Sequence, residues 1–155
     1  MGLDMYLDKS LLVSEFDWDK ELINKVYDML GVTDESNNYQ HLYIKLPAIY
    51  WRKANSIHDW FVQNVQHGQD DCRDDYFVSK RQLVELLALV QKQKNAKMGE
   101  FLKPTDGFCF GPTDNEERFQ EDMKYTEAAL ERELAFIAKE AKRGRDWTYT
   151  YSSSW

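Results

Sequence analysis

The sequence predicts an α+β fold in which about four helices pack on a small antiparallel sheet. Stretches with an apolar residue at every third or fourth position, typical of amphipathic helices, occur along the chain. Between and beside them lie short stretches in which apolar and polar residues alternate singly, as they do in half-buried strands. The chain has 155 residues, of which 43% are hydrophobic. This size and composition predict a single globular domain over residues 1–155.

The strands are expected near both ends of the chain. Residues 3–7 and 147–151 place large apolar or aromatic side chains at every second position. Residues 42–46 alternate in the same way, but Pro47 lacks the amide hydrogen that a central strand needs, so pairing is expected to end there. The run 108–110, between two glycines, fits either a three-residue strand or a loop that fills the core.

Four segments have helical periodicity, near residues 18–30, 51–66, 80–92 and 114–142. Gly31 follows the first and is expected to end it in a left-handed conformation. Ser79 and Gln82 have the spacing of a capping box at the start of the third helix. Thr113 and Glu116 have the same spacing before the fourth, and predict that it begins there.

Charge and processing signals indicate the class of partner and the compartment. Lys and Arg total 20 against 27 Asp and Glu, a net charge of −7, which argues against nucleic acid or an anionic membrane as a partner. Asp4 and Asp8 occupy the region where a signal peptide needs a basic start and an apolar core. Cys72 and Cys109 are therefore expected to be free thiols. We expect a soluble cytoplasmic protein.

His58, Cys72 and Asp71 are the candidate catalytic residues. His58 lies on the apolar face of the segment 51–66, where it is either a shielded general base or a core histidine whose nitrogens are hydrogen-bonded. Cys72 with His58 has the residue types of a nucleophile and its base, but no nucleophile motif surrounds either residue.

No metal and no cofactor is expected. The loop from Asp70 to Asp75 has several carboxylates, but it lacks the glycine and the final glutamate of a calcium-binding loop. His67 and Cys72 have no second ligand pair at zinc spacing. No glycine-rich phosphate-binding motif is present. The alternative for the acidic loop is a solvated segment that caps the next helix.

Aromatic residues make up 14% of the chain, and Trp, Tyr and Arg are the residues that dominate protein–protein hot spots. The alternative is that these aromatic side chains pack the helices against the sheet. Trp60, seven residues or about two helical turns after Lys53 on the predicted helix, is an example that fits both interpretations.

An ordered set of short motifs extends over nearly the whole chain: MGLDMYL, YWRKANSIHDWFVQ, DDC, GFCFG and YSSSW. In these motifs the chain resembles a family of small proteins encoded by bacteriophages and prophages, with Cys109 at a position where an aromatic residue is more usual. The resemblance implies an accessory protein that acts in the bacterial cytoplasm, and it implies no particular reaction. The motif positions that it marks for testing are Trp51, Arg52, Lys53, Asn55, His58, Trp60, Asp70, Asp71 and Cys72.

Two hypotheses follow. In the first, the protein is an acidic binding module that docks on a host bacterial protein, such as a defence or nucleic-acid-handling system. Its candidate binding residues are Arg52, Lys53, Asn55, Trp60, Asp70 and Asp71. In the second, it is a small enzyme whose site combines the helix of residues 52–58 with the loop 70–72, which are neighbours along the chain. A sheltered pocket that contains both segments would favour the enzyme, and an exposed acidic and aromatic surface would favour the binding module.

Overall fold

The structure, a computed structural model, describes the whole chain except residues 1, 15–19, 32–40, 73–74 and 108. The predicted α+β fold is confirmed, with four helices and a four-stranded antiparallel sheet in the described part. In chain order the elements are β1 (Asp4–Ser14), α1 (Lys20–Leu30), β2 (His41–Arg52), α2 (Asn55–Asn64), β3 (Tyr76–Val78), α3 (Lys80–Lys94), α4 (Glu116–Ala141) and β4 (Thr148–Ser154).

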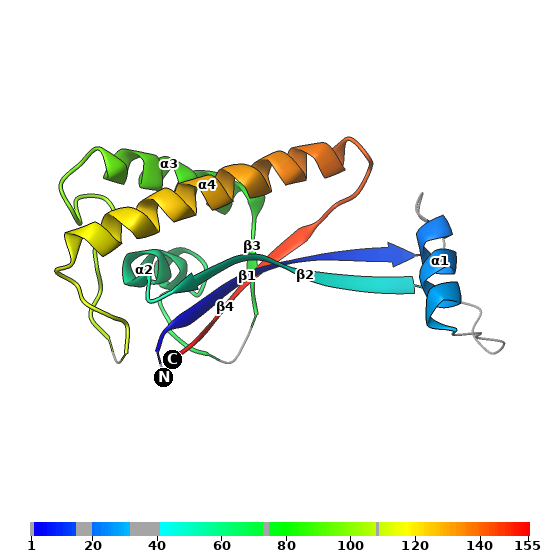
Figure 1. Ribbon diagram of the computed structural model, residues 1–155, viewed down its shortest axis with the longest axis horizontal. Coiled ribbons are helices and arrows are strands. Elements are labelled where there is room, and N and C mark those ends of the chain that lie inside the picture. The colour runs from blue at the N-terminus through cyan, green and yellow to red at the C-terminus, as the bar shows by residue number, and fades with distance from the viewer. Residues whose placement is uncertain (1, 15–19, 32–40, 73–74, 108) are drawn as a thin grey trace.

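The sheet has the strand order β2-β1-β4-β3. The predicted strands at the two ends of the chain pair with each other, with Asp4 opposite Ser154 and Leu7 opposite Tyr151. The two termini therefore lie side by side (Figure 1). The last residues of the chain are an inner part of the fold, and β3 pairs with them as a short edge strand.

One face of the sheet is covered by α2, α3 and α4. Met5, Leu7, Trp51 and Tyr151 point from the strands into a core shared with these helices. The helical side chains buried there include Ile57, Phe61, Leu83, Leu86, Val90, Phe119, Met123 and Leu130. On the opposite face the large side chains Tyr6, Tyr50 and Phe77 are exposed, so the described part of the fold has two layers.

The prediction that strand pairing ends at Pro47 is wrong. β2 continues through Pro47, which lies opposite Asp8 beside a bulge, and it reaches Arg52. Because β2 is an edge strand, it tolerates a residue without an amide hydrogen. The helix predicted from residue 51 therefore begins later, at Asn55, and Lys53 turns the chain with a φ of 59°.

The helix boundaries follow local signals to different degrees. The Ser79–Gln82 capping box is confirmed at the start of α3, and Gly31 after α1 has the expected positive φ of 64°. The Thr113–Glu116 box is wrong, because Asn115 caps α4 by accepting a hydrogen bond from the Arg118 amide. Asparagine is as good an N-cap as threonine and stands next to the helix, so it takes the role.

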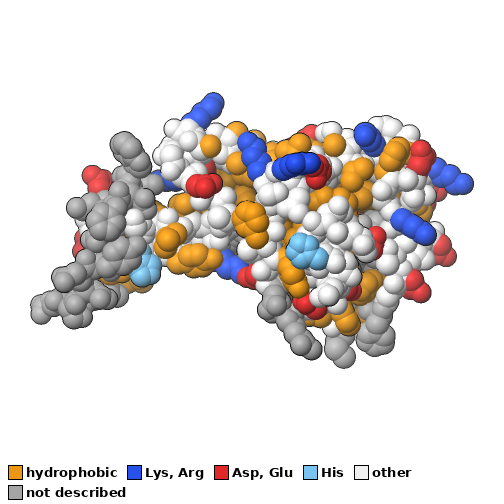
Figure 2. Space-filling view, turned by 180° about the vertical axis from the view of Figure 1, so that it is seen from behind, with side chains coloured by type: hydrophobic (Ala, Val, Ile, Leu, Met, Phe, Trp, Pro, Cys, Tyr) orange, Lys and Arg blue, Asp and Glu red, His pale blue; other side chains and the backbone are white. Residues whose placement is uncertain are grey.

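A long two-stranded arm extends from the body of the protein (Figure 1). β4 pairs with β1 only as far as Ser10, and beyond that residue β1 pairs with β2 alone. We call residues 11–14 and 41–44 together with α1 the arm. Leu11, Val13 and Ile23 are buried in a small cluster between α1 and the strands. Hydrophobic side chains are also visible on the outside of the arm (Figure 2).

The run 108–110 is a loop, not a strand, in its described residues. Phe110 is buried in the core, and the carbonyl of Cys109 accepts a hydrogen bond from the Leu3 amide. Phe108 lies outside the described residues. In the described part of the chain, no helix has the length and apolar character needed to cross a membrane.

Candidate functional site

His58 is at the centre of the candidate site and is almost completely buried, with 1% of its surface exposed. Its Nδ1 lies 2.7 Å from the hydroxyl of Tyr151 on β4. Burial raises the pKa of Tyr151 well above its usual value, so the hydroxyl keeps its proton. The carboxylate of Asp70 lies 3.2 Å from Nε2 and favours a proton on that nitrogen, so Nδ1 of the neutral imidazole accepts a hydrogen bond from the Tyr151 hydroxyl.

Asp70 lies on the other side of the His58 ring. Its Oδ2 is 3.2 Å from Nε2, although the two groups are not aligned as a hydrogen bond. Its Oδ1 accepts a hydrogen bond of 3.2 Å from the indole of Trp155. Burial lowers the pKa of His58 below 6.5, and the nearby Asp70 carboxylate opposes this effect in part. The imidazole is therefore neutral at pH 7.

Aromatic rings enclose the His58–Tyr151 pair. The ring of Phe61 stacks on Tyr151 at 3.9 Å between centroids, and Phe110 packs edge-on against His58 at 5.0 Å. Phe110 in turn contacts Trp155, with a centroid distance of 6.1 Å. The imidazole is thus held in a hydrophobic shell, as a packed core histidine is, with one nitrogen hydrogen-bonded to Tyr151 and the other beside the Asp70 carboxylate.

An open pocket of about 300 Å³ lies at the surface next to this shell, lined by Asp70, Asp71, Cys72 and Trp155. We call it the Asp70–Trp155 pocket. The thiol of Cys72 is free and exposed, and 42% of the Trp155 surface is accessible. His58 is not among the lining residues. The pocket therefore presents carboxylates and an indole ring to a ligand, whereas His58 lies behind Asp70 and contacts its carboxylate.

Asp71 is positioned by its neighbours in the chain. Its carboxylate accepts a hydrogen bond of 2.8 Å from Tyr76 on β3, and its carbonyl accepts one of 3.2 Å from Gln66. These contacts fasten the loop at the end of α2 to the edge of the sheet. Both carboxylates of the pocket are thus anchored by buried or half-buried groups, and the pocket has a defined shape.

The remaining candidates lie elsewhere. Arg52 is at the end of β2, 3.8 Å from the carboxylate of Asp4. Asn55 is buried at the start of α2 and donates to the carbonyls of Phe110 and Pro112. Together with Lys53 it lines a small hollow near the N-terminal end of α4. The two hydrogen bonds of Asn55 hold the segment that contains Phe110 and Pro112 in place.

Trp60 is a core residue with 6% of its surface exposed. Its exposed edge contributes to a second open pocket of about 210 Å³, which is also lined by Phe101 and Lys103. The structure therefore brings Asp70, Asp71 and Cys72 to one pocket and places His58 against Asp70, as their neighbourhood in the chain suggests. It does not bring Arg52, Lys53, Asn55 or Trp60 to the lining of the Asp70–Trp155 pocket.

Sequence reasoning missed the roles of Tyr151 and Trp155 at this site. Both come from the C-terminal strand and its end, more than 80 residues from His58 and Asp70. The available signal was the alternation through Tyr149 and Tyr151, which places Tyr151 on the inner face of β4. The partner of a buried tyrosine hydroxyl can be identified only when the strand order is known.

The chemistry available at the site is that of charge and stacking. Among the described residues, no three or more His, Cys, Asp or Glu side chains are grouped so that they could hold a metal ion. Asp74 and Arg73, which follow Cys72, lie outside the described residues. The carboxylates of Asp70 and Asp71 beside an exposed indole form a surface suited to a cationic group.

Comparison with known proteins adds no assignment to this description. No protein-family model, curated protein or solved structure matches the chain. The interpretation of the site therefore depends on its own residues, on the buried His58–Tyr151 pair and on the acidic and aromatic pocket in front of it.

Proposed function

We propose that this is a phage-encoded accessory protein that binds a host bacterial protein through the Asp70–Trp155 pocket. The observation that supports the proposal is the lining of that pocket, which consists of two carboxylates, a thiol and a half-exposed indole ring. The phage origin and the bacterial host follow from the sequence resemblance alone.

The pocket has the composition that binds a lysine or arginine side chain. A guanidinium group forms paired hydrogen bonds with carboxylates and stacks on aromatic rings, and an ammonium group is attracted to the face of an indole. Asp70 is held between His58 and Trp155, and Asp71 is held by Tyr76. Such prior positioning reduces the entropy that is lost when a partner side chain binds.

The charge of the chain favours the same class of partner. A net charge of −7 attracts a basic protein surface and repels nucleic acid. A host protein with a cationic groove, such as a nucleic-acid-handling or defence protein, therefore fits this surface. An accessory protein of this kind acts by covering the groove.

The second candidate function is a small enzyme, and one observation favours it. The 3.2 Å contact between His58 and Asp70 joins the helix and the loop that were proposed to share a site. His58, however, is buried against Tyr151 and Phe110 and does not line the pocket. A general base must lie within hydrogen-bond distance of the group that it deprotonates, so the binding module is the function that the geometry supports better.

The proposal is tested with Trp155→Ala and the matched control Phe101→Ala. The two aromatic residues have nearly equal exposure, 42% and 45%, and they line different pockets. The probe is a short arginine-containing peptide, compared with the same peptide in which alanine replaces arginine, and binding is measured by titration calorimetry. We expect the wild type and Phe101→Ala to bind the arginine peptide and Trp155→Ala to bind it at least about fivefold more weakly, the size of one cation–π contact.

Equal binding of the arginine and alanine peptides by the wild type would contradict the proposal. Loss of binding in Phe101→Ala but not in Trp155→Ala would assign the interaction to the other pocket. Circular dichroism of both variants ensures that the comparison is made between folded proteins.

A further inference from the structure

The outer edge of β2 is protected along half of its length by α4. Arg118, Tyr125 and Arg132 are seven residues apart and therefore share one side of the helix. Their side chains donate to three successive outward carbonyls of β2: Arg118 to Arg52 at 2.9 Å, Tyr125 to Tyr50 at 2.9 Å and Arg132 to Ala48 at 3.2 Å. The cover ends there.

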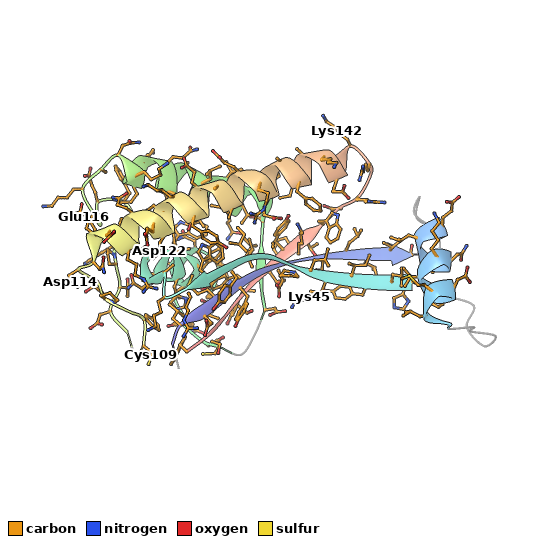
Figure 3. The ribbon with its side chains drawn as sticks, in the orientation of Figure 1. Lys45, Cys109, Asp114, Glu116, Asp122 and Lys142 are labelled. Atoms are coloured by element: carbon orange, nitrogen blue, oxygen red, sulfur yellow. The ribbon has the colours of Figure 1, made fainter. Side chains whose placement is uncertain are left out.

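The other half of this edge has no such cover among the described residues. The carbonyl of His41 accepts a long hydrogen bond from Tyr27. No described side chain is hydrogen-bonded to the backbone of residues 42–46, which lie between His41 and Ala48. An open row of backbone donors and acceptors at a sheet edge is a template for another strand. This row lies at the base and along the side of the arm, where Figure 3 places Lys45.

We propose that residues 42–46 pair in antiparallel fashion with the same residues of a second copy of the chain. The two copies are related by a two-fold axis that passes beside Ile44, perpendicular to the sheet. The pairing joins two four-stranded sheets into one. This surface is separate from the Asp70–Trp155 pocket, because the arm lies at the end of β1 that is distant from the paired termini.

The side-chain pattern selects the position of the axis. Such an axis keeps the helix-covered faces of both copies on the same side, so residues that face each other must point to the same face of the sheet. An axis beside Tyr43 would place Lys45 opposite the imidazole of His41 and leave Leu46 without an apolar partner, and an axis beside Lys45 would place two lysines opposite each other. Like charges in direct opposition are destabilising.

An axis beside Ile44 produces favourable pairs on both faces. On the helix-covered face, Ile44 lies opposite Ile44, and Leu42 lies opposite Leu46. On the open face, Tyr43 lies opposite Lys45. Leu46 and Tyr43 are exposed in the single chain, at 42% and 65%, so the pairing covers side chains that the fold itself leaves in water. The segment is thus self-complementary in this register.

Charge does not prevent two acidic chains from meeting at this edge. Residues 42–46 include only one charged side chain, Lys45. Lys45 lies 2.6 Å from the carboxylate of Asp75 and 3.2 Å from that of Asp8, and these contacts raise its pKa above the usual value. The positive charge of Lys45 is therefore neutralised by carboxylates of its own copy. A host strand is the competing occupant, and the register test below distinguishes it.

Sedimentation velocity of the full chain over a roughly hundredfold concentration range is the first test. We expect the mass to rise with concentration from 18.4 kDa to twice that value. Ile44→Arg places two guanidinium groups at the axis and should weaken the dimer at least about tenfold. Leu12→Arg is the matched control, because Leu12 is an exposed residue of the same arm on β1, one strand inward from the β2 edge, and it should leave the dimer intact.

A cysteine test fixes the register and does not depend on the stability of the arginine variant. In a background with Cys72→Ser and Cys109→Ser, Ile44→Cys should form a disulfide-linked dimer under mild oxidation, because facing residues have Cα atoms about 5 Å apart. Tyr43→Cys should not, since the two copies of residue 43 are diagonal neighbours about 7–8 Å apart. A monomer at every concentration, a dimer insensitive to Ile44→Arg, or faster cross-linking of Tyr43→Cys would each overturn the proposal.

Discussion

Replacing His58 by alanine tests whether this residue stabilises the core. The ring is 1% exposed and packs against Phe110 and Tyr151, so its removal leaves a cavity. Truncation of a buried side chain of this size costs about 2–5 kcal/mol. The hydroxyl of Tyr151 also loses its acceptor at 2.7 Å, which costs about 1–3 kcal/mol for a buried group. The two costs do not add in full, because the surrounding side chains relax once in response to both changes. We therefore expect a total loss of about 3–5 kcal/mol in the free energy of unfolding.

The assay is urea unfolding followed by tryptophan fluorescence, together with thermal melting. A loss of this size corresponds to a decrease in Tm of about 10 °C for a domain of this length. His58→Gln should recover part of the loss, since it retains a polar group and much of the volume. Tyr151→Phe should cost about 1–2 kcal/mol, because it leaves Nδ1 of His58 without a donor. A free energy of unfolding within about 0.5 kcal/mol of the wild type for His58→Ala would refute the core role.

Three further predictions concern charge and metal ions. Burial lowers the pKa of His58 in the folded state below 6.5, so below pH 6.5 the unfolded chain binds more protons than the folded one. The free energy of unfolding should therefore fall as the pH decreases below 6.5. His58→Gln should remove this contribution, as measured by urea titrations at several pH values. Burial raises the pKa of Asp122 from 3.8 to about 6, so the stability of the folded state falls as the pH rises through this range. Asp122→Asn should then stabilise the protein by about 1 kcal/mol at pH 7, allowing for partial exposure, and give almost no gain at about pH 4. Thermal melting in excess chelator should match melting without it, and a decrease of more than about 5 °C would reveal a structural metal ion.

Much of the fold follows from local patterns in the sequence. The alternation in residues 3–7 and 147–151 predicts the two paired strands, and Ser79 with Gln82 predicts the start of α3. Tyr50 to Arg52 could not be assigned in this way, because their spacing fits the helical stripe that continues into α2. The position of β2 at the sheet edge, where Pro47 is tolerated, depends on strand order, which the local pattern does not encode.

The candidate site was predictable to a similar extent. His58 and Asp70 are close in the chain, with a helix end between them, and the contact between them was therefore expected. Tyr151 and Trp155 reach the site because β4 lies between β1 and β3, and this arrangement is set by the burial of whole strands. The arm was missed for the same reason, since nothing in residues 11–14 indicates that β4 stops pairing at Ser10.

Capture of a partner from bacterial lysate by paired variants tests the central claim most directly. Wild type, Trp155→Ala and Phe101→Ala are immobilised at equal density, and the retained proteins are quantified by mass spectrometry at low and high salt. The account predicts a basic host protein that the wild type and Phe101→Ala retain, that Trp155→Ala loses, and that high salt releases. Equal retention by all three proteins, or a retained partner whose binding does not depend on salt, would contradict binding through the Asp70–Trp155 pocket.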